Sequence, residues 1–329
     1  MKIIDLFSGI GGFSLGFQRA GYQFTEHYFS EIDKHAIANY KHNFPHAINL
    51  GDITTIRSTD LTGIDIITFG SPCQDFSLAG RRKGLAGSKS SLIQHAIALI
   101  AQLRPSIFIW ENVKGTFSSN ARADFWAIIQ AFANIGGYRL EWQLLNTSWL
   151  LPQNRERIYL IGHLAGRSIP GVFPITENDC APRKEKTYQF QAKLSGTLKD
   201  NGNMNADDTY IIPKIASTLT GGGHSGGLHS DMTVIRQLPR GKNKGADLKI
   251  CPTISSNAFQ ENNLLGGIRR LTEIECERLQ GFPDNWTQYG NYNGRIRRIS
   301  KTQRYKLIGN AVTVDIVTMI AKRLKITTQ

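Results

Sequence analysis

The 329-residue sequence predicts an α/β fold built on a parallel sheet, together with a smaller second domain of strands and loops. Three observations carry this prediction. Short β-branched runs alternate with amphipathic helical segments over residues 3–164. The chain opens with a strand, a glycine-rich turn and a helix, which is typical of a nucleotide-type site. Helical periodicity is then lost over residues 167–268, where glycine, threonine, asparagine and lysine are abundant.

The first strand, residues 3–7, runs into a turn that contains Gly9, Gly11 and Gly12, and an amphipathic helix follows over residues 13–20. Glycines let a ligand approach the backbone, and the N–H groups at the start of a helix point toward it. The spacing differs from Gly-x-Gly-x-x-Gly, so an adenosyl ligand is favoured over a dinucleotide. A tight turn without any ligand is the alternative.

Two acidic residues follow at the same expected edge of the sheet. The second strand, residues 24–30, ends at Glu31, where a carboxylate can hold a ribose diol, and Asp33 is the alternative for this role. Asp52 closes a third short segment and is suited to an adenine amino group. Either acid alone could instead be a helix cap or a solvated loop residue.

A cysteine follows the next buried strand, residues 64–69. Glycine and proline end this strand and place Cys73 on a turn, where a thiolate could act as a nucleophile. An inert loop cysteine is the alternative. The polar, basic stretch 75–91 suits a mobile lid over a phosphate backbone, or else a connector.

A carboxylate and two arginines complete the candidate site. A helix over residues 92–103 leads to a strand at 107–110, which delivers Glu111 at its carboxyl end, where it is expected to face Cys73. Arg155 and Arg157 alternate along an extended stretch and are expected to project to one side, where they could grip phosphate or a base carbonyl. A salt-bridged strand edge is the alternative.

The remaining elements are read from periodicity and capping signals. Helices are expected at 124–135 and 313–325, and strands at 140–145 and 157–164. Thr272 and Glu275 form a capping box that opens a short helix to Gln280, and a basic loop follows it.

Net charge, the length of the apolar runs and the spacing of the cysteines limit which class of protein this can be. The net charge of +13 suits a polyanion such as nucleic acid. No apolar run reaches the length of a membrane span, and residue 3 already enters a strand, so we expect neither a membrane segment nor a signal peptide. The four cysteines form no Cys-x-x-Cys pair, which argues against a zinc site or a disulfide framework and fits the cytoplasm.

The chain resembles the bacterial and phage DNA (cytosine-5)-methyltransferases over nearly its whole length. The segments that carry the resemblance occur in the family's order: residues 5–12, 71–74, 111–113, 153–157, 270–283 and 309–312. Ser71 stands where many members have a second proline. The resemblance implies the S-adenosylmethionine-dependent methyltransferase fold, a Rossmann-like mixed sheet with helices on both faces, plus a small target-recognition domain. It implies a catalytic domain of residues 1–166 with 300–329, and a target-recognition domain with its supporting helix over 167–299.

The resemblance also implies roles for individual residues. Cys73 would attack carbon 6 of a flipped-out cytosine, Glu111 would serve the ring at N3, and Arg155 and Arg157 would hold the base and its phosphate. The residues implied to bind the cofactor are Phe7, Gly9, Gly11, Gly12, Glu31, Asp52, Ile53, Pro72, Asn310 and Val312. Those expected to bind DNA are Gln74, Ser77, Arg81, Arg82, Lys83 and Gln153.

The implied cofactor is S-adenosylmethionine, released as S-adenosylhomocysteine, with no metal. The implied partner is double-stranded DNA, methylated by a monomer within restriction-modification or phage DNA protection, with a cognate endonuclease as a further partner. A tRNA cytosine-5 methyltransferase is the nearest alternative, and a catalytically idle DNA-binding regulator is another. A nicotinamide oxidoreductase is disfavoured, because the glycine turn that follows the first strand lacks the spacing Gly-x-Gly-x-x-Gly.

Overall fold

The computed structural model describes residues 1–71, 92–118, 123–179, 235–237, 246–248, 263–265 and 269–326. Contacts divide the chain into two compact units. Unit 1 comprises Met1–Cys180, Pro252–Glu261 and Thr272–Gln329, and unit 2 comprises Ala181–Cys251 and Asn262–Leu271. Residues 272–299, expected in the second domain, therefore make their contacts within unit 1.

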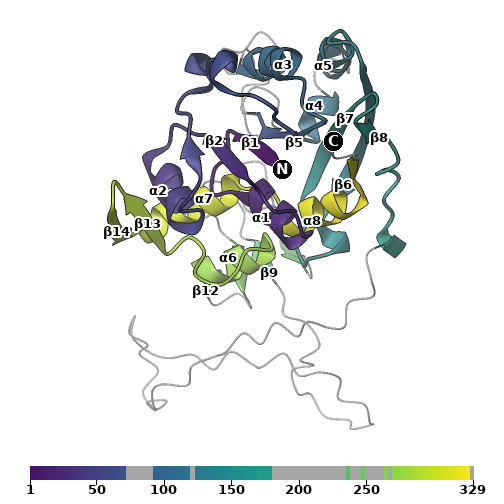
Figure 1. Cartoon of the computed structure of the whole chain (residues 1–329). Coiled ribbons are helices and arrows are strands. Elements are labelled where there is room, and N and C mark those ends of the chain that lie inside the picture. The colour runs from purple at the N-terminus through teal and green to yellow at the C-terminus, as the bar shows by residue number, and fades with distance from the viewer. Residues whose placement is uncertain are drawn as a thin grey trace, which may run out of the picture. The chain divides into compact units, whose positions relative to one another are not determined.

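Unit 1 contains the main sheet and all of the described α-helices (Figure 1). Its strands are β1 (Lys2–Leu6), β2 (Glu26–Ser30), β3 (Ile48–Asn49), β4 (Ile66–Gly70), β5 (Ile107–Val113), β6 (Tyr138–Asn146), β7 (Glu156–Leu164), β8 (Ser168–Ile169), β13 (Tyr289–Tyr292), β14 (Arg295–Arg298) and β15 (Lys325–Ile326). Its helices are α1 (Gly12–Arg19), α2 (Lys34–Asn43), α3 (Leu92–Leu103), α4 (Gly115–Ser118), α5 (Ala123–Ala133), α6 (Glu273–Leu279), α7 (Lys301–Asn310) and α8 (Val314–Arg323). Short 3₁₀ turns are η1 (Ile53–Thr55), η2 (Ser58–Asp60), η5 (Thr147–Trp149) and η6 (Glu177–Asp179).

The main sheet has seven strands in the order β3-β2-β1-β4-β5-β7-β6. The first five strands are parallel, and β7 runs antiparallel to both of its neighbours. The carboxyl ends of the parallel strands therefore meet at one edge, where ligands bind in open sheets of this kind. The predicted mixed α/β fold is confirmed.

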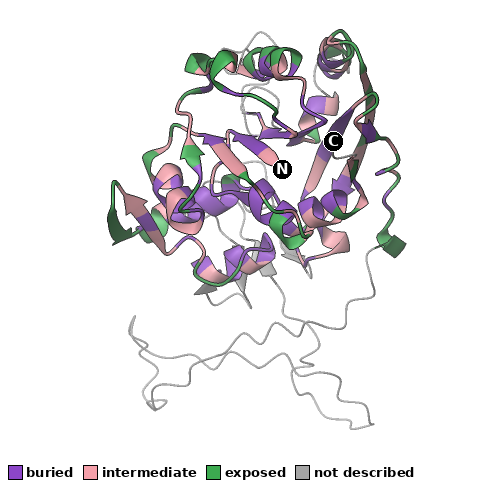
Figure 2. Cartoon of the chain, in the orientation of Figure 1, coloured by how far each residue is buried: buried purple, intermediate pink, exposed green. Residues whose placement is uncertain are grey.

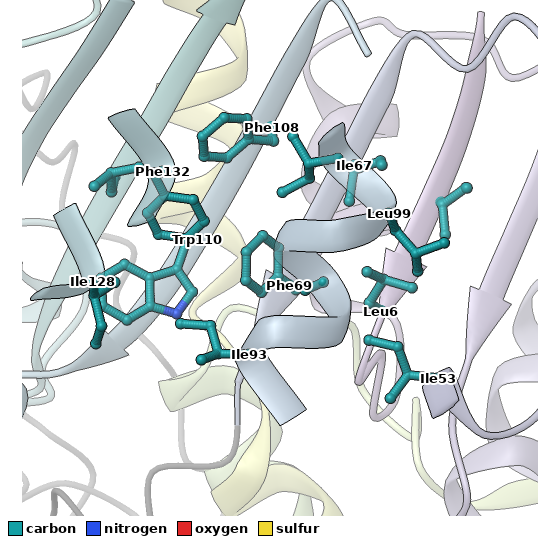
Figure 3. Packing of buried hydrophobic residues seen from close by; sticks show 14 of the residues in the cluster. Leu6, Ile53, Ile67, Phe69, Ile93, Leu99, Phe108, Trp110, Ile128 and Phe132 are labelled. Carbon is teal, nitrogen blue, oxygen red and sulfur yellow. The ribbon is translucent and has the colours of Figure 1, made fainter. Parts of the chain in front are cut away.

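Helices cover both faces of the sheet because its central strands are apolar on both sides. Alternate residues such as Phe69, Phe108 and Trp110 join one core cluster with α3 and α5, as Figure 3 shows. Their neighbours along the strands, including Ile66 and Ile107, join a second cluster with α1 and α8. Strand residues one apart thus belong to different cores, which fixes the register of the sheet.

The C-terminal helices complete the core around the N-terminus. Phe17 of α1 packs with Val317 and Ile320 of α8, and all three side chains are fully buried. Gly16 lets the two helices approach, because a Cβ atom there would lie 2.5 Å from Cγ1 of Val317. The first and last helices of unit 1 therefore form one layer against the sheet.

The short helix α6 begins as predicted. The Thr272 side chain accepts from the Glu275 N–H, and the Glu275 carboxylate accepts from the Thr272 N–H, which is the reciprocal pairing of a capping box. This satisfies two of the unpaired donors at the helix start.

Two regions differ from the expectation. Strand β5 continues through Glu111 to Val113, because β7 pairs alongside it as far as Val113 opposite Arg157. The basic loop expected after α6 contains the β13–β14 hairpin, with its turn at Asn293 and Gly294.

Unit 2 contributes four short described strands, which form one antiparallel sheet in the order β10-β9-β11-β12. They are β9 (Ile235–Gln237), β10 (Ala246–Leu248), β11 (Asn263–Leu265) and β12 (Arg269–Arg270). Across the described parts of both units, no helix combines the length and apolarity that crossing a bilayer requires.

Candidate active site

The glycine turn between β1 and α1 has the conformations that its sequence favours. Gly9 and Gly11 adopt left-handed φ angles of 55° and 83°, and Phe7 shares this region at 51°. A Cβ on Gly11 would lie 2.4 Å from Cε2 of Phe44, whereas one on Gly9 would meet nothing within 4 Å. The backbone at Gly9 is therefore open to a ligand.

Val312, in the segment between α7 and α8 near the C-terminus, packs against the glycine turn. A Cβ on Gly12 would lie 2.7 Å from Cγ2 of Val312. Val312 is buried, whereas the nearby Asn310 is exposed. The structure thus brings together Gly12 and Val312, two residues that sequence reasoning assigned to one cofactor site.

Glu31 connects the ends of β1 and β2. One carboxylate oxygen accepts from the Gly9 N–H at 2.9 Å, and the other accepts from the N–H groups of Ile32 and Asp33 at 2.8 and 2.9 Å. Asp33 caps α2, accepting from the N–H of His35. Ile32 is 74% exposed, an apolar side chain at the sheet edge that sequence reasoning missed.

Asp52 and Ile53 differ in their surroundings. Asp52 is exposed and caps η1, and hydrogen bonds from the Thr54 N–H and hydroxyl hold the pKa of its carboxyl below the ordinary value. Ile53 is buried in the core beneath α3. Asp52 therefore has the capping role that the sequence left open, and its exposed carboxylate stays accessible.

Glu111 and Arg157 meet at the carboxyl end of β5. The Glu111 Oε1 atom lies 3.2 Å from Nε of Arg157, and the two side chains are only 10% and 14% exposed. Gly70 pairs with Glu111 across β4 and β5, and a Cβ there would lie 3.1 Å from Glu111 Oε2. Glycine at position 70 thus gives the carboxylate its space beside the strand that leads to Cys73.

A ring of polar contacts fixes the end of β4. The Ser71 hydroxyl accepts from Trp110 Nε1 at 3.0 Å and from Asn112 Nδ2 at 3.1 Å, and Asn112 Oδ1 accepts from the Thr116 hydroxyl. Sequence reasoning missed this role of Asn112, although it lies beside Glu111. The serine hydroxyl therefore fixes the backbone directly after β4.

The two arginines do not share one side. Arg155 is 4% exposed and donates to the backbone carbonyls of Ala311 at 2.8 Å and Gly309 at 3.5 Å. It precedes β7, so the alternation of a strand does not align it with Arg157. Gln153 has no exposed surface. Both side chains are therefore buried, and Arg155 lies against the C-terminal segment.

Several expected site residues lie outside the described parts of the chain. They are Pro72, Cys73, Gln74, Ser77, Arg81, Arg82 and Lys83. Within the described ranges, no group of three or more His, Cys, Asp or Glu side chains is arranged to hold a metal ion.

A buried polar cluster lies beneath the glycine turn. Asp5 is fully buried, and one carboxylate oxygen accepts from Thr68 at 3.0 Å while the other lies 3.3 Å from the Tyr40 hydroxyl. The Ser14 hydroxyl lies 2.9 Å from His27 Nε2 and 2.7 Å from the Tyr40 hydroxyl. Burial raises the pKa of Asp5 to about 8 and lowers the pKa of His27 to about 4, because the protein interior disfavours the charged form of each side chain.

Comparison with known proteins identifies the class. The C-5 cytosine-specific DNA methylase family matches residues 1–326. The chain is 30% identical to the Type II methyltransferase M.Bsp6I of Bacillus sp. (strain RFL6), over 98% of each protein. It is 31% identical to the Type II methyltransferase M.FnuDI of Fusobacterium nucleatum, over 99% of this chain and 94% of the relative.

A solved structure supports the fold. The Dnmt2 methyltransferase of S. pombe aligns with a TM-score of 0.62 at 18% identity, covering 97% of this chain and 96% of that one. The seven-stranded sheet is thus the fold of a known methyltransferase. Since the family match extends over almost the entire sequence, the chain belongs to the C-5 cytosine-specific DNA methylase family and is a DNA (cytosine-5)-methyltransferase.

Proposed function

We propose that this enzyme methylates a cytosine turned out of duplex DNA, using Cys73 as a covalent nucleophile and Glu111 as the group that serves the ring at N3. The observation that carries the proposal is the Glu111–Arg157 pair beside Gly70. Cys73 follows Gly70 by three residues, so the chain can carry it no further than about 11 Å from that glycine. Nucleophile and acid therefore belong to one neighbourhood.

The chemistry requires both groups. Carbon 5 of cytosine is a weak nucleophile until a thiolate adds to carbon 6, which forms a sulfur–carbon bond and makes carbon 5 enamine-like. After carbon 5 is methylated, a base removes its proton and the thiolate leaves carbon 6, which restores the aromatic ring and frees Cys73. The addition places negative charge on the ring, which a proton or hydrogen bond at N3 from Glu111 stabilises. Arg157 orients the Glu111 carboxyl and faces the base. Neither group reaches these atoms within a stacked duplex, so the cytosine must flip out.

Arg155 has a supporting role in this proposal. Its guanidinium holds the carbonyls of Gly309 and Ala311, next to Val312, which packs on the glycine turn. We therefore assign Arg155 to positioning the C-terminal segment, not to contact with the base.

The residues present fit S-adenosylmethionine. The open backbone at Gly9, the carboxylate of Glu31, the exposed Ile32 and the exposed Asp52 offer polar and apolar contacts for an adenosyl group at the carboxyl ends of β1 to β3. Phe7, Gly11, Gly12, Ile53, Pro72, Asn310 and Val312 would complete this site. When bound, the cofactor supplies an electrophilic methyl group on a sulfonium.

The biological setting follows from the relatives. Those compared are Type II methyltransferases, which supports a role in protecting DNA against a cognate endonuclease. We propose that the enzyme acts as a cytoplasmic monomer. Within the expected span 167–299, we assign target recognition to residues 167–271, because residues 272–299 make their contacts within unit 1. We assign phosphate contacts to the basic stretch that includes Arg81, Arg82 and Lys83.

The first experiment traps the covalent step. Duplex DNA carrying 5-fluorocytosine at the target site is incubated with the methyl donor and each variant. The wild-type chain and Cys276→Ala, which removes a buried thiol in α6, should form an irreversible adduct, and Cys73→Ser should form none. An adduct with Cys73→Ser would refute the assignment.

The second experiment measures methyl transfer to duplex DNA and to tRNA. Glu111→Gln should reduce the rate on DNA at least about 100-fold, the usual contribution of a positioned acid. The matched control is Glu156→Gln, which removes an exposed carboxylate paired with Lys114. A near-normal rate for Glu111→Gln would remove this residue from the mechanism, and faster transfer to tRNA would change the substrate.

A further inference from the structure

The β13–β14 hairpin is an arginine-rich ribbon on the surface of unit 1. All four residues of β14 are exposed, and three of them are Arg295, Arg297 and Arg298; Figure 2 colours this strand as exposed. Residues 285–314 contain six Lys or Arg and no Asp or Glu. Charge of one sign is thus concentrated on one short element.

Three carboxylates in α6, in the segment after it and at the start of α2 already have cationic partners. Asp33 pairs with Lys306, Asp284 with Arg278, and Glu277 with Arg304. Within the described residues, no ion pair links a carboxylate to any of the three ribbon arginines. Their guanidinium groups are therefore available to an anionic partner.

The ribbon is held rigidly on α2. The Asn39 side chain donates to the carbonyls of Trp286 and Tyr289, at 2.8 and 2.9 Å. Tyr292 contacts His35 through its hydroxyl at 2.6 Å, and a Cβ on Gly290 would lie 2.9 Å from that of Ala38. A fixed scaffold reduces the entropy that binding would otherwise cost.

The base of the ribbon also contacts the candidate cofactor turn. Trp286 Nε1 donates to the Ile10 carbonyl at 3.0 Å, so the ribbon is attached at the carboxyl edge of the sheet (Figure 1). Three strand spacings separate β2 from β5, about 14 Å, and α2 adds roughly 10 Å. The ribbon therefore lies about 15–25 Å from Glu111, which corresponds to about four to seven base pairs of duplex.

We infer that the β13–β14 ribbon binds the phosphate backbone of the substrate duplex, on one side of the target cytosine and outside the recognition sequence. Planar guanidinium groups match phosphate oxygens in geometry and charge, and a backbone contact needs no base sequence. The inference rests on the proposed duplex DNA substrate.

The test compares three triple variants. In the first, Arg295→Gln, Arg297→Gln and Arg298→Gln are combined, and in the second the same positions carry lysine. The control combines Arg57→Gln, Arg139→Gln and Lys322→Gln, which removes equal charge from exposed positions elsewhere on unit 1. Thermal melting and S-adenosylhomocysteine binding confirm that each variant is folded.

Affinity for duplex DNA is measured against salt concentration. Since each phosphate contact contributes a slope of about 0.9, the glutamine variant should lose about 2–3 units of slope and bind roughly 100- to 1000-fold more weakly at about 0.1 M salt. The lysine variant should retain most of the slope, and the control should match wild type. The single-turnover rate at saturating DNA should stay unchanged, because the ribbon does not touch the reacting base.

Duplex length gives a second readout. Extending the DNA from about three to about ten base pairs beyond the target should strengthen wild-type binding on one side only, and this gain should vanish in the glutamine variant. Equal slopes for wild type and the glutamine variant, or equal losses in the glutamine variant and the control, would overturn the inference. A wild-type chain that binds no duplex would refute the proposed substrate, and the inference with it.

Discussion

Asp5 offers a direct test of how burial controls stability. Its carboxyl is fully buried, and burial raises its pKa to about 8 against the opposing hydrogen bonds from Thr68, Tyr40 and Ser14. An unfolded aspartate has a pKa of about 3.9. Between these values the folded chain holds a proton that the unfolded chain has released, so the free energy of unfolding falls as pH rises.

His27 acts in the opposite direction over part of this range. Burial lowers its pKa to about 4, whereas unfolded histidine titrates near about 6.5. Below that pH the unfolded chain binds the extra proton, so the contribution of His27 is lost as pH falls. The two effects oppose each other between about pH 4 and 6.5, and Asp5 acts alone from about 6.5 to 8.

The magnitude follows from the difference in protonation. One proton changes the free energy of unfolding by about 1.4 kcal/mol per pH unit, and this slope falls to half near pH 8, where the folded Asp5 carboxyl is half protonated. Deprotonation of Asp5 therefore lowers the free energy of unfolding by about 1.5 kcal/mol between about pH 6.5 and 8. Asp5→Asn keeps the shape of the side chain and removes the titration. The stability of wild type relative to this variant should therefore fall by about 1.5 kcal/mol over the same interval.

Urea denaturation followed by tryptophan fluorescence measures this difference, with Asp60→Asn as a control that changes an exposed carboxylate. Parallel curves for wild type and Asp5→Asn between the two pH values would show that Asp5 is charged in the folded chain. That result would refute the assignment of a buried, protonated carboxyl beneath the glycine turn.

Two further substitutions test the core. Gly16→Ala should destabilise unit 1 by about 1–3 kcal/mol through overpacking, because the new Cβ would lie 2.5 Å from Val317 Cγ1. In urea denaturation, the double variant Gly16→Ala with Val317→Ala should recover part of this loss of stability. Fully additive losses in the double variant would contradict the explanation. Arg304→Met should cost about 3–5 kcal/mol, since it leaves the fully buried Glu277 without its cation. Arg278→Met, at the exposed pair with Asp284, should lower the free energy of unfolding by less than about 1 kcal/mol. Equal losses of stability in Arg304→Met and Arg278→Met would contradict the idea that burial makes the Glu277 pair more important.

The fold was predictable where local pattern decides the structure. Apolar runs at residues 64–69 and 107–110 became neighbouring parallel strands, and the Thr272–Glu275 capping box formed as its spacing requires. The meeting of Glu31 with the glycine turn also followed from strand order.

The resemblance anticipated the meeting of Gly12 with Val312, but the partners of the two arginines were not predictable from local pattern. Arg155 and Arg157 have the same side-chain chemistry, yet one binds the Ala311 carbonyl and the other pairs with Glu111, because only Arg157 lies within β7. The β13–β14 hairpin was expected as a loop, since arginine hides the alternation of a strand; the Asn293–Gly294 pair was the one local signal for its turn.

The packing of α1 against α8 has a consequence for synthesis. The partners Gly16 and Val317 are 301 positions apart, so a ribosome moving at about 5–20 residues per second needs roughly 15–60 s to make the second after the first. During that interval the apolar side of α1, including Phe17, lacks its cover. The glycine turn therefore gains its contact with Val312 only when translation is nearly over, and a product that ends before α8 would expose an apolar surface and aggregate.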